Sequence, residues 1–145
     1  MMTLEHLKLL APKANQFSPG TGGTPAITFH EVSDMLSGCS ELAARYARYI
    51  YAGESTQRND IRIAVLIMLL GLEKVRAQKM SAGYWLNQID LAIAIHAHDS
   101  VPSQRRKARS LRRKHWRLLD EENLELVVSY FSAADWELRA AIREW

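Results

Sequence analysis

The sequence contains a ten-residue apolar run, Ile63 to Leu72 (IAVLIMLLGL), inside a segment with helical character from about Asn59 to Gln78. The middle of this segment is apolar on all sides in helical projection, and such a helix is stable when other elements cover it. The run is about half the length that a membrane span needs. We therefore predict a helix buried by other helices. Gly71 costs about 1 kcal/mol against Ala inside a helix, so it predicts a close helix crossing.

Capping signals predict further helices on both sides of this segment. Thr28 with Glu31 forms a capping box, Ser40 can cap a second helix that ends at Gly53, and Ser81 opens a fourth helix. Apolar residues follow each cap at helical spacing: Val32, Met35 and Leu36 after the first, Leu42, Ala43, Tyr46, Ala47 and Ile50 after the second, and Trp85, Ile89, Ala92, Ile93 and His96 after the fourth.

The C-terminal segment predicts two more helices. Asp120 is expected to cap one of them, and Ser132 with Asp135 forms a capping box for the other. Trp136, Ala140 and Trp145 follow at helical spacing, and tryptophans in this setting are more often core residues than part of a cofactor site. No segment shows sustained alternation with a period of two residues. The predicted fold class is therefore all-α: a compact multi-helix domain with a helix-turn-helix-like pair and a flexible N-terminal segment.

Proline and glycine divide the chain near its start. Three of the four prolines and three of the seven glycines lie between residues 12 and 25, after a short helix from Leu4 to Leu10. The predicted organisation is an N-terminal segment, residues 1–27, made of this helix and a linker. A single all-helical domain follows over residues 28–145, with a basic helix at about 102–119 and acidic C-terminal helices over 120–145.

Positive charge is concentrated in one short stretch. Eight of the nineteen Lys and Arg residues lie in the run Arg105 to Arg117 (RRKARSLRRKHWR), and no acid occurs between Val101 and Leu119. Residues 101–119 sum to +8, whereas residues 120–145 carry seven acids against two arginines. A positive field of this density favours a polyanion or a complementary acidic surface as partner.

As a helix, the basic run is amphipathic. Val101, Ala108, Leu111, His115, Leu118 and Leu119 cluster on one face at 100° per residue. The opposite face carries six arginines and one tryptophan: Arg105, Arg106, Arg109, Arg112, Arg113, Arg117 and Trp116. Arginine forks match phosphate and carboxylate groups, and an indole can stack on a nucleic-acid base.

Three interpretations of this face follow. The first is nucleic acid, with the arginines on phosphates and Trp116 stacking or wedging. The second is an acidic protein surface, for which the acidic tail of a second copy is one source. The third is a solvated face with Trp116 packed on the acidic helix. Neighbouring like charges destabilise the helix that carries them, which favours an external partner, and we expect nucleic acid.

Residues Thr28 to Tyr51 have a helix-turn-helix layout, with Ser37, Gly38 and Cys39 in the turn. Gly38 can supply a positive φ at this turn. On the second helix, Arg45 and Arg48 would face outward, where they could reach base edges or phosphates. Two helices around a glycine also occur in many all-α proteins, so ordinary helix packing is the other interpretation.

No catalytic, metal or cofactor site is predicted. His96 and His98 diverge by about 200° on a helix and cannot share a metal. Cys39 is the sole cysteine, which excludes an internal disulfide framework and a multi-cysteine zinc site. The glycines at 20–23 lack the phosphate-loop pattern. Because the N-terminus also lacks a secretory signal, we expect a non-catalytic cytoplasmic protein.

The N-terminal half resembles the late-gene antitermination proteins of lambdoid phages, the Q proteins. The resembling segments are Met2-Thr3-Leu4-Glu5, then Pro12-Lys13 with a Pro/Gly/Thr-rich linker, and ITFHEVSDML from Ile27 to Leu36. A looser similarity covers residues 54–70. The resemblance implies binding to DNA near a late promoter and to RNA polymerase. Larger relatives carry a zinc-binding cysteine cluster, which this chain lacks.

The predicted function is therefore a phage-type transcription regulator that is non-catalytic and binds nucleic acid. DNA is the expected target, RNA the other option, and RNA polymerase a further partner. The alternative is a protein-interaction or assembly module whose basic helix docks on an acidic protein surface. The sequence leaves a homo-oligomer open and predicts no membrane partner.

Overall fold

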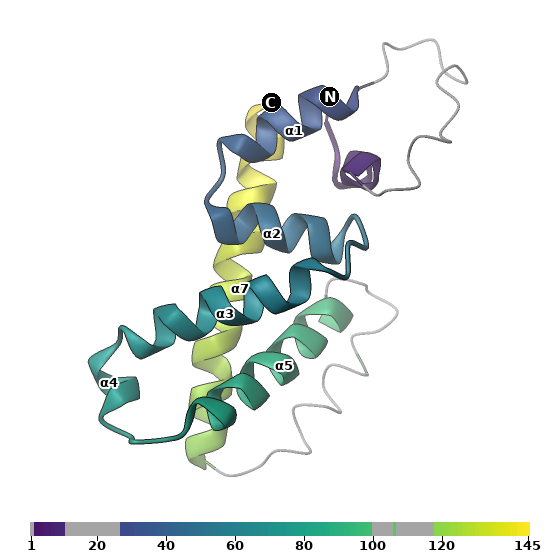
Figure 1. The fold of residues 1–145 in the computed structure, drawn as a ribbon. Coiled ribbons are helices and arrows are strands. Elements are labelled where there is room, and N and C mark those ends of the chain that lie inside the picture. Colours follow the sequence, from purple (N-terminus) through teal and green to yellow (C-terminus); the bar gives the residue numbers. More distant parts are fainter. Residues whose placement is uncertain (1, 11–26, 100–105, 107–117) are drawn as a thin grey trace. The chain divides into compact units, whose positions relative to one another are not determined.

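The fold is all-α, as predicted: every regular element among the residues described is a helix (Figure 1). The computed structural model describes residues 2–10, 27–99, 106 and 118–145. Its elements are a 3-10 helix, η1 (Leu4–Leu10), followed by α1 (Phe29–Ser37), α2 (Glu41–Ile50), α3 (Gln57–Leu70), α4 (Glu73–Arg76), α5 (Ala82–Asp99) and α7 (Leu118–Glu144). Among these described helices, none is both long and apolar enough to cross a membrane.

The contacts group the chain into two compact units. Unit 1 comprises Met1–Arg58 and Ala134–Trp145, and unit 2 comprises Asn59–Ala133. The long helix α7 therefore supplies its first part to unit 2 and its last part to unit 1. The division predicted from the sequence, residues 1–27 and 28–145, stays a prediction.

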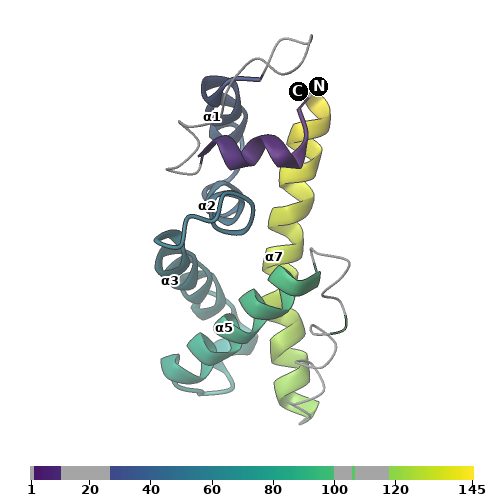
Figure 2. The same ribbon diagram turned by 90° about the vertical axis from the view of Figure 1, so that its right-hand side faces the viewer.

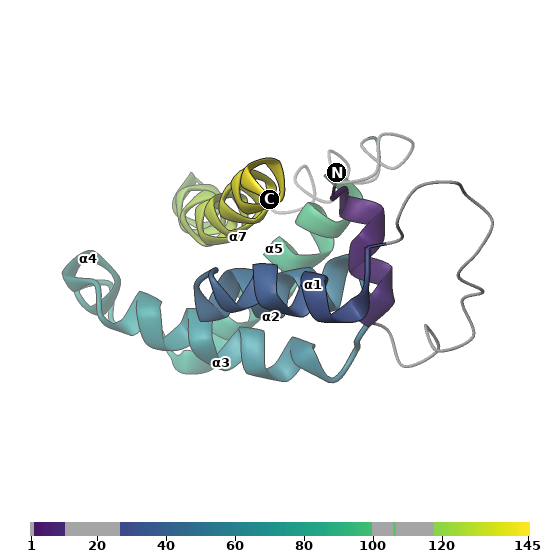
Figure 3. The same ribbon diagram turned by 90° about the horizontal axis from the view of Figure 1, so that it is seen from above.

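The core of unit 1 combines aliphatic side chains with alanines and one tyrosine. On α2, Ala43, Tyr46 and Ala47 of the predicted apolar stripe are buried, and Leu42 and Ile50 are half-buried. η1 packs on α1 and α2 through the buried Leu7 and Leu10 (Figure 3). The first residues of the chain thus belong to the core of this unit.

The predicted helix starts in unit 1 are confirmed. The Thr28 hydroxyl accepts a hydrogen bond from the Glu31 amide at 3.3 Å, and the Ser40 hydroxyl accepts one from the Ala43 amide at 3.2 Å. Gly53, where the second helix was predicted to end, follows α2 with a φ of 71°, a conformation that favours glycine. The predicted positive φ at Gly38 is wrong, because its φ is −83° and it continues the right-handed turn.

Unit 2 contains most of α3, together with α4, α5 and the first part of α7 (Figure 2). Trp85 of α5 is completely buried. Ser81 caps α5, since its hydroxyl accepts a hydrogen bond from the Tyr84 amide at 3.1 Å. The predicted stripe of α5 is confirmed, with Ile89, Ala92 and Ile93 buried. Arg62 of α3 and Asp90 of α5 form an ion pair at 2.8 Å, so charge as well as apolar burial joins these helices.

The helix predicted over Asn59–Gln78 is shorter than expected. α3 ends at Leu70, Gly71 lies in an exposed turn, and the short helix α4 follows from Glu73. The predicted helix crossing at Gly71 is therefore wrong: its low helix propensity ends the helix instead. The prediction that α3 is covered on all sides is also wrong, because Ile63, Ile67 and Leu70 are 48%, 67% and 41% exposed.

The C-terminal segment forms one helix where two were predicted. Its buried residues keep helical spacing without interruption across the predicted boundary at Ser132: Leu124, Val127, Val128, Phe131, Ala134, Leu138 and Ile142. A continuous buried stripe outweighs the local capping signal of Ser132 and Asp135. Asp120 likewise lies within the first turn of α7. The predicted burial of Trp136 and Trp145 is wrong, since they are 67% and 51% exposed.

Candidate nucleic-acid interface

Three of the nine predicted contact residues fall within the described part of the chain: Arg45, Arg48 and Arg106. The other six lie outside the described residues: Arg105, Arg109, Arg112, Arg113, Trp116 and Arg117. Arg106 is in helical conformation and its side chain is exposed. The predicted one-sided arginine face around Trp116 is otherwise outside the described residues and stays a prediction.

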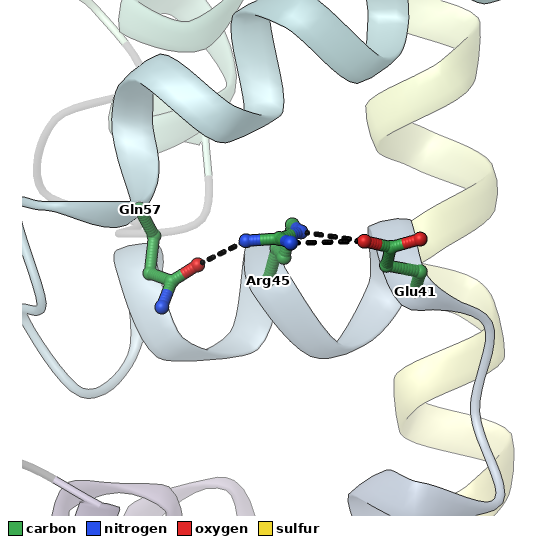
Figure 4. Close-up of polar contacts among 3 residues, drawn as sticks. All are labelled: Glu41, Arg45 and Gln57. Carbon is green, nitrogen blue, oxygen red and sulfur yellow. Dashed lines mark hydrogen bonds and ion pairs between the residues drawn. The ribbon is translucent and has the colours of Figure 1, made fainter.

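Arg45 is held by its own unit. Its Nε and Nη2 donate to Glu41 Oε1 at 3.1 and 2.9 Å, and its Nη1 donates to Gln57 Oε1 at 3.0 Å (Figure 4). Glu41 lies four residues earlier on α2, and Gln57 opens α3. All three guanidinium nitrogens therefore have an intramolecular acceptor. Binding a phosphate through Arg45 would require some of these hydrogen bonds to break.

Arg48 is also turned toward a neighbouring carboxylate. Its Nη1 lies 3.8 Å from Glu54 Oε2, and both side chains are less than a third exposed. Glu54 is fixed in turn, because its backbone amide donates to the Arg48 carbonyl oxygen at 2.9 Å. This pair closes the turn after α2, so Arg48 has a structural position in the fold.

A side chain of α7 occupies the N-terminus of α2. Glu137 Oε2 accepts hydrogen bonds from the Ser40 amide at 2.9 Å and from the Ser40 hydroxyl at 2.7 Å. A carboxylate is favoured at this position by the partial positive charge of a helix N-terminus. In helix-turn-helix proteins the N-terminal residues of the second helix contact base edges. Here the protein's own Glu137 carboxylate accepts from the amide and hydroxyl of Ser40, the capping residue at that end.

A tyrosine–carboxylate network that was not predicted from the sequence lies at the C-terminal end of α2. Tyr51 Oη donates to Asp135 Oδ1 at 2.7 Å, and Arg139 Nε donates to Asp135 Oδ2 at 2.7 Å. Arg139 Nη2 also donates to Tyr51 Oη at 3.2 Å. Burial, and then the hydrogen bond to Asp135, raise the pKa of Tyr51 to about 12. Burial likewise raises the pKa of Tyr46, whose ring packs edge-on against Tyr51.

This network explains the position of Asp135. The spacing of Ser132 and Asp135 predicted a capping box, whereas the Asp135 carboxylate accepts hydrogen bonds from Tyr51 and Arg139 within α7. The Asp135–Arg139 pair has the spacing of four residues that brings helix side chains together, so this ion pair could be predicted from the sequence. Tyr51 is 84 residues away in the chain, and no local pattern connects the two.

The remaining reactive side chains have ordinary structural surroundings. The Cys39 thiol lies 3.7 Å from the Met35 carbonyl oxygen, and burial followed by the charge of Glu137 raises its pKa. A thiol with a raised pKa carries little thiolate and is a weak nucleophile. His96 is half-buried against the Phe131 ring. Among the described residues, no group of His, Cys, Asp and Glu could hold a metal ion.

Charge separates sharply along the sequence. Residues 101–119 hold eight of the nineteen Lys and Arg residues and no acid, a sum of +8. The rest of the chain holds all sixteen acids and the other eleven Lys and Arg residues, a formal net charge of −5. Comparison with known protein families, curated proteins and solved structures finds no match for this chain.

Proposed function

We propose that this protein is a non-catalytic, cytoplasmic transcription regulator of the phage antiterminator type that binds nucleic acid through the run Arg105–Arg117. The observation that carries the proposal is the charge separation: residues 101–119 sum to +8, whereas the rest of the chain sums to −5. A single strongly basic segment on an acidic protein directs a polyanion to one place. DNA is the proposed target, with RNA polymerase as a second partner.

The proposal assigns phosphate contacts to the six arginines of the run, with Trp116 stacking on a base or sugar. The exposed side chain of Arg106 supports this assignment. The structural pairs of Arg45 with Glu41 and of Arg48 with Glu54 favour a different role for those two arginines, which is to hold α2 and its following turn. We therefore propose that DNA binding does not depend on them.

Fluorescence anisotropy with labelled duplex DNA at about 50 mM salt tests this assignment. The triple variant Arg109→Ala, Arg112→Ala and Arg113→Ala removes three of the proposed phosphate contacts, and its affinity should fall by at least about 100-fold. The double variant Arg45→Ala and Arg48→Ala should keep its affinity within about threefold. A second double variant, Arg58→Ala and Arg76→Ala, controls for the loss of positive charge, because both side chains are exposed outside the run.

Two outcomes would overturn the proposal. One is wild-type protein that binds neither duplex nor single strands at this salt concentration. The other is a triple variant that binds as tightly as the wild type. A large loss of DNA affinity in the Arg45 and Arg48 double variant alone would instead show that DNA contacts α2.

A second candidate function is docking of the basic run on an acidic protein surface. The first turns of α7 favour it, because Glu121, Glu122 and Glu125 are all exposed there. Under this alternative the triple variant would change the oligomer size in light scattering and leave nucleic-acid behaviour unchanged. The two functions therefore give opposite results with the same protein.

A further inference from the structure

A histidine side chain closes the first turn of η1. Thr3 directly precedes η1, and His6 is the third residue of this helix. The Thr3 backbone amide donates a hydrogen bond to His6 Nδ1 at 2.9 Å, and the Thr3 hydroxyl oxygen lies 3.1 Å from the same nitrogen. The His6 amide donates in turn to the Thr3 carbonyl oxygen at 3.1 Å. The two residues therefore bind each other at the start of the helix.

These contacts require a neutral imidazole ring. A backbone N–H group can only donate, so His6 Nδ1 is an unprotonated acceptor and the ring hydrogen lies on Nε2. In the charged ring both nitrogens carry hydrogen, and the Nδ1–H group would face the Thr3 N–H group. Protonation of His6 therefore breaks the hydrogen bond from the Thr3 amide.

The position of His6 is one that Glu or Gln holds in a capping box. There the residue three positions after the cap accepts the cap amide with a side-chain oxygen. A Gln oxygen does not titrate and stays an acceptor, whereas an imidazole normally gains its proton between about pH 8 and 5. Histidine at this position makes the closure of the first turn depend on pH.

The packing of η1 makes it sensitive to this hydrogen bond. η1 has seven residues, and a helix of this length is not stable in water by itself. It packs on α1 and α2, and Met2, Leu7 and Leu10 are the buried residues at this end of the chain (Figure 3). Because few side chains anchor η1, one hydrogen bond is a substantial part of the free energy that keeps it docked.

The surroundings of His6 contain other charged and titratable side chains. On η1, on the two helices that pack against it and on the last turn of α7 in the same unit, these are Glu5, Lys8, His30, Glu31, Asp34, Glu41, Arg45, Tyr46, Arg48, Tyr49, Arg143 and Glu144. Among the residues that the structure describes, His6 forms a hydrogen bond or ion pair with none of them. Imidazole is the side chain that normally changes charge between about pH 5 and 8, so His6 and His30 are the two groups to compare.

We propose that Thr3 and His6 form a pH-sensitive latch, which holds η1 on α1 and α2 at neutral pH and releases it in mild acid. The stabilisation needs the neutral ring, so it is complete at the upper end of the range from about pH 8 to 5 and is lost as the pH falls. Loss of one hydrogen bond should weaken docking by about tenfold. Release exposes Met2, Leu7 and Leu10, and this proposal does not depend on nucleic-acid binding.

Hydrogen exchange of the full chain, measured by mass spectrometry at about pH 5, 6 and 7.5, tests the latch. Each exchange rate is divided by the intrinsic rate at the same pH, which gives a protection factor. In the wild type, the protection of the η1 amides should fall by about tenfold between pH 7.5 and 5. The amides of α1 and α2 should keep their protection.

Three variants separate the acceptor from the charge. His6→Gln keeps a side-chain acceptor that does not titrate, so its η1 amides should be as protected at every pH as those of the wild type at pH 7.5. His6→Ala should show the low protection at every pH. His30→Gln is the matched control, because His30 is an exposed histidine on α1, and it should keep the pH dependence of the wild type. Equal helicity by circular dichroism shows that the variants are folded.

Four results would overturn the proposal. The first is equal protection of η1 in the wild type at pH 5 and 7.5. The second is a His6→Gln variant that still loses protection in acid, which would assign the effect to another group. The third is a loss of protection in acid that α1 and α2 share, which would show general destabilisation of the unit. The fourth is a His6→Ala variant with the protection of the wild type at pH 7.5, which would show that these hydrogen bonds do not hold η1.

Discussion

Asn123 is the buried polar residue of α7 in unit 2, with 3% of its surface exposed. Its side-chain amide pairs with that of Gln78: Gln78 Nε2 donates to Asn123 Oδ1 at 2.9 Å, and Asn123 Nδ2 donates to Gln78 Oε1 at 2.8 Å. Asn123 Nδ2 also donates to Tyr84 Oη at 3.0 Å, and Tyr84 Oη donates to Asp120 Oδ1 at 2.5 Å. One side chain thus ties α7 to α5 and to the turn after α4.

Replacing Asn123 by Ala removes three hydrogen bonds, each with a net contribution of about 1 kcal/mol. Gln78 and Tyr84 are half-buried, so water can replace part of what they lose. Alanine also returns about 0.5 kcal/mol of helix propensity. We therefore expect the free energy of unfolding to fall by about 2 kcal/mol.

Urea denaturation followed by far-ultraviolet circular dichroism measures this change. Asn87→Ala is the control, because Asn87 is an exposed asparagine on α5 and the same propensity gain applies. Its free energy of unfolding should stay within about 0.5 kcal/mol of the wild type. If the Asn123 and Asn87 variants were equally stable, the hydrogen-bond network would contribute nothing and the reasoning would be refuted.

Three more predictions follow from burial and hydrogen bonding. Trp85→Ala should destabilise the protein by about 3 to 5 kcal/mol in thermal unfolding, because the side chain is fully buried, whereas Trp136→Ala should cost less than about 1 kcal/mol; equal effects would contradict the assigned core. Burial and the hydrogen bond to Asp135 raise the pKa of Tyr51 to about 12. The protonated Tyr51 therefore stabilises the folded state fully at pH values below about 10, the ordinary pKa of tyrosine. This contribution is lost between pH 10 and 12, so denaturation across that range should show a smaller loss of stability in Tyr51→Phe than in the wild type; unchanged behaviour would count against the network. Glu137→Ala removes the acceptor of the hydrogen bonds from the Ser40 amide and hydroxyl, so the free energy of unfolding should fall by about 1 to 2 kcal/mol. Glu144→Ala, at an exposed position of α7, is the control and should leave the free energy of unfolding unchanged.

Several helix starts could be predicted from the sequence because their capping residues act on neighbouring backbone amides. Thr28, Ser40 and Ser81 each accept the backbone hydrogen bond that their position predicted. The buried stripes of α2 and α5 were readable for a similar reason, because periodicity reports which face a helix buries. Glu41 and Arg45 also follow the four-residue rule for helix pairs.

Long-range packing accounts for the features that local sequence patterns did not predict. The capping signal at Ser132 is real chemistry, but α7 continues because its buried stripe from Leu124 to Ile142 is unbroken. Glu137 reaches Ser40 across 97 residues, and no local pattern records that partner. The all-round apolarity of α3 predicted burial on every side, and this was wrong: the described chain covers the face of Ile61, Val65 and Leu69 and leaves Ile63, Ile67 and Leu70 exposed.

The salt dependence of DNA affinity is the most direct test of the proposed function. Neutralising six phosphates of duplex DNA predicts that the logarithm of the association constant falls with the logarithm of salt concentration with a slope near −5. The account predicts this slope for the wild type and for the Arg45 and Arg48 double variant, and a slope near −3 for the triple variant of the run. A wild-type slope near zero, or no binding at about 50 mM salt, would contradict it.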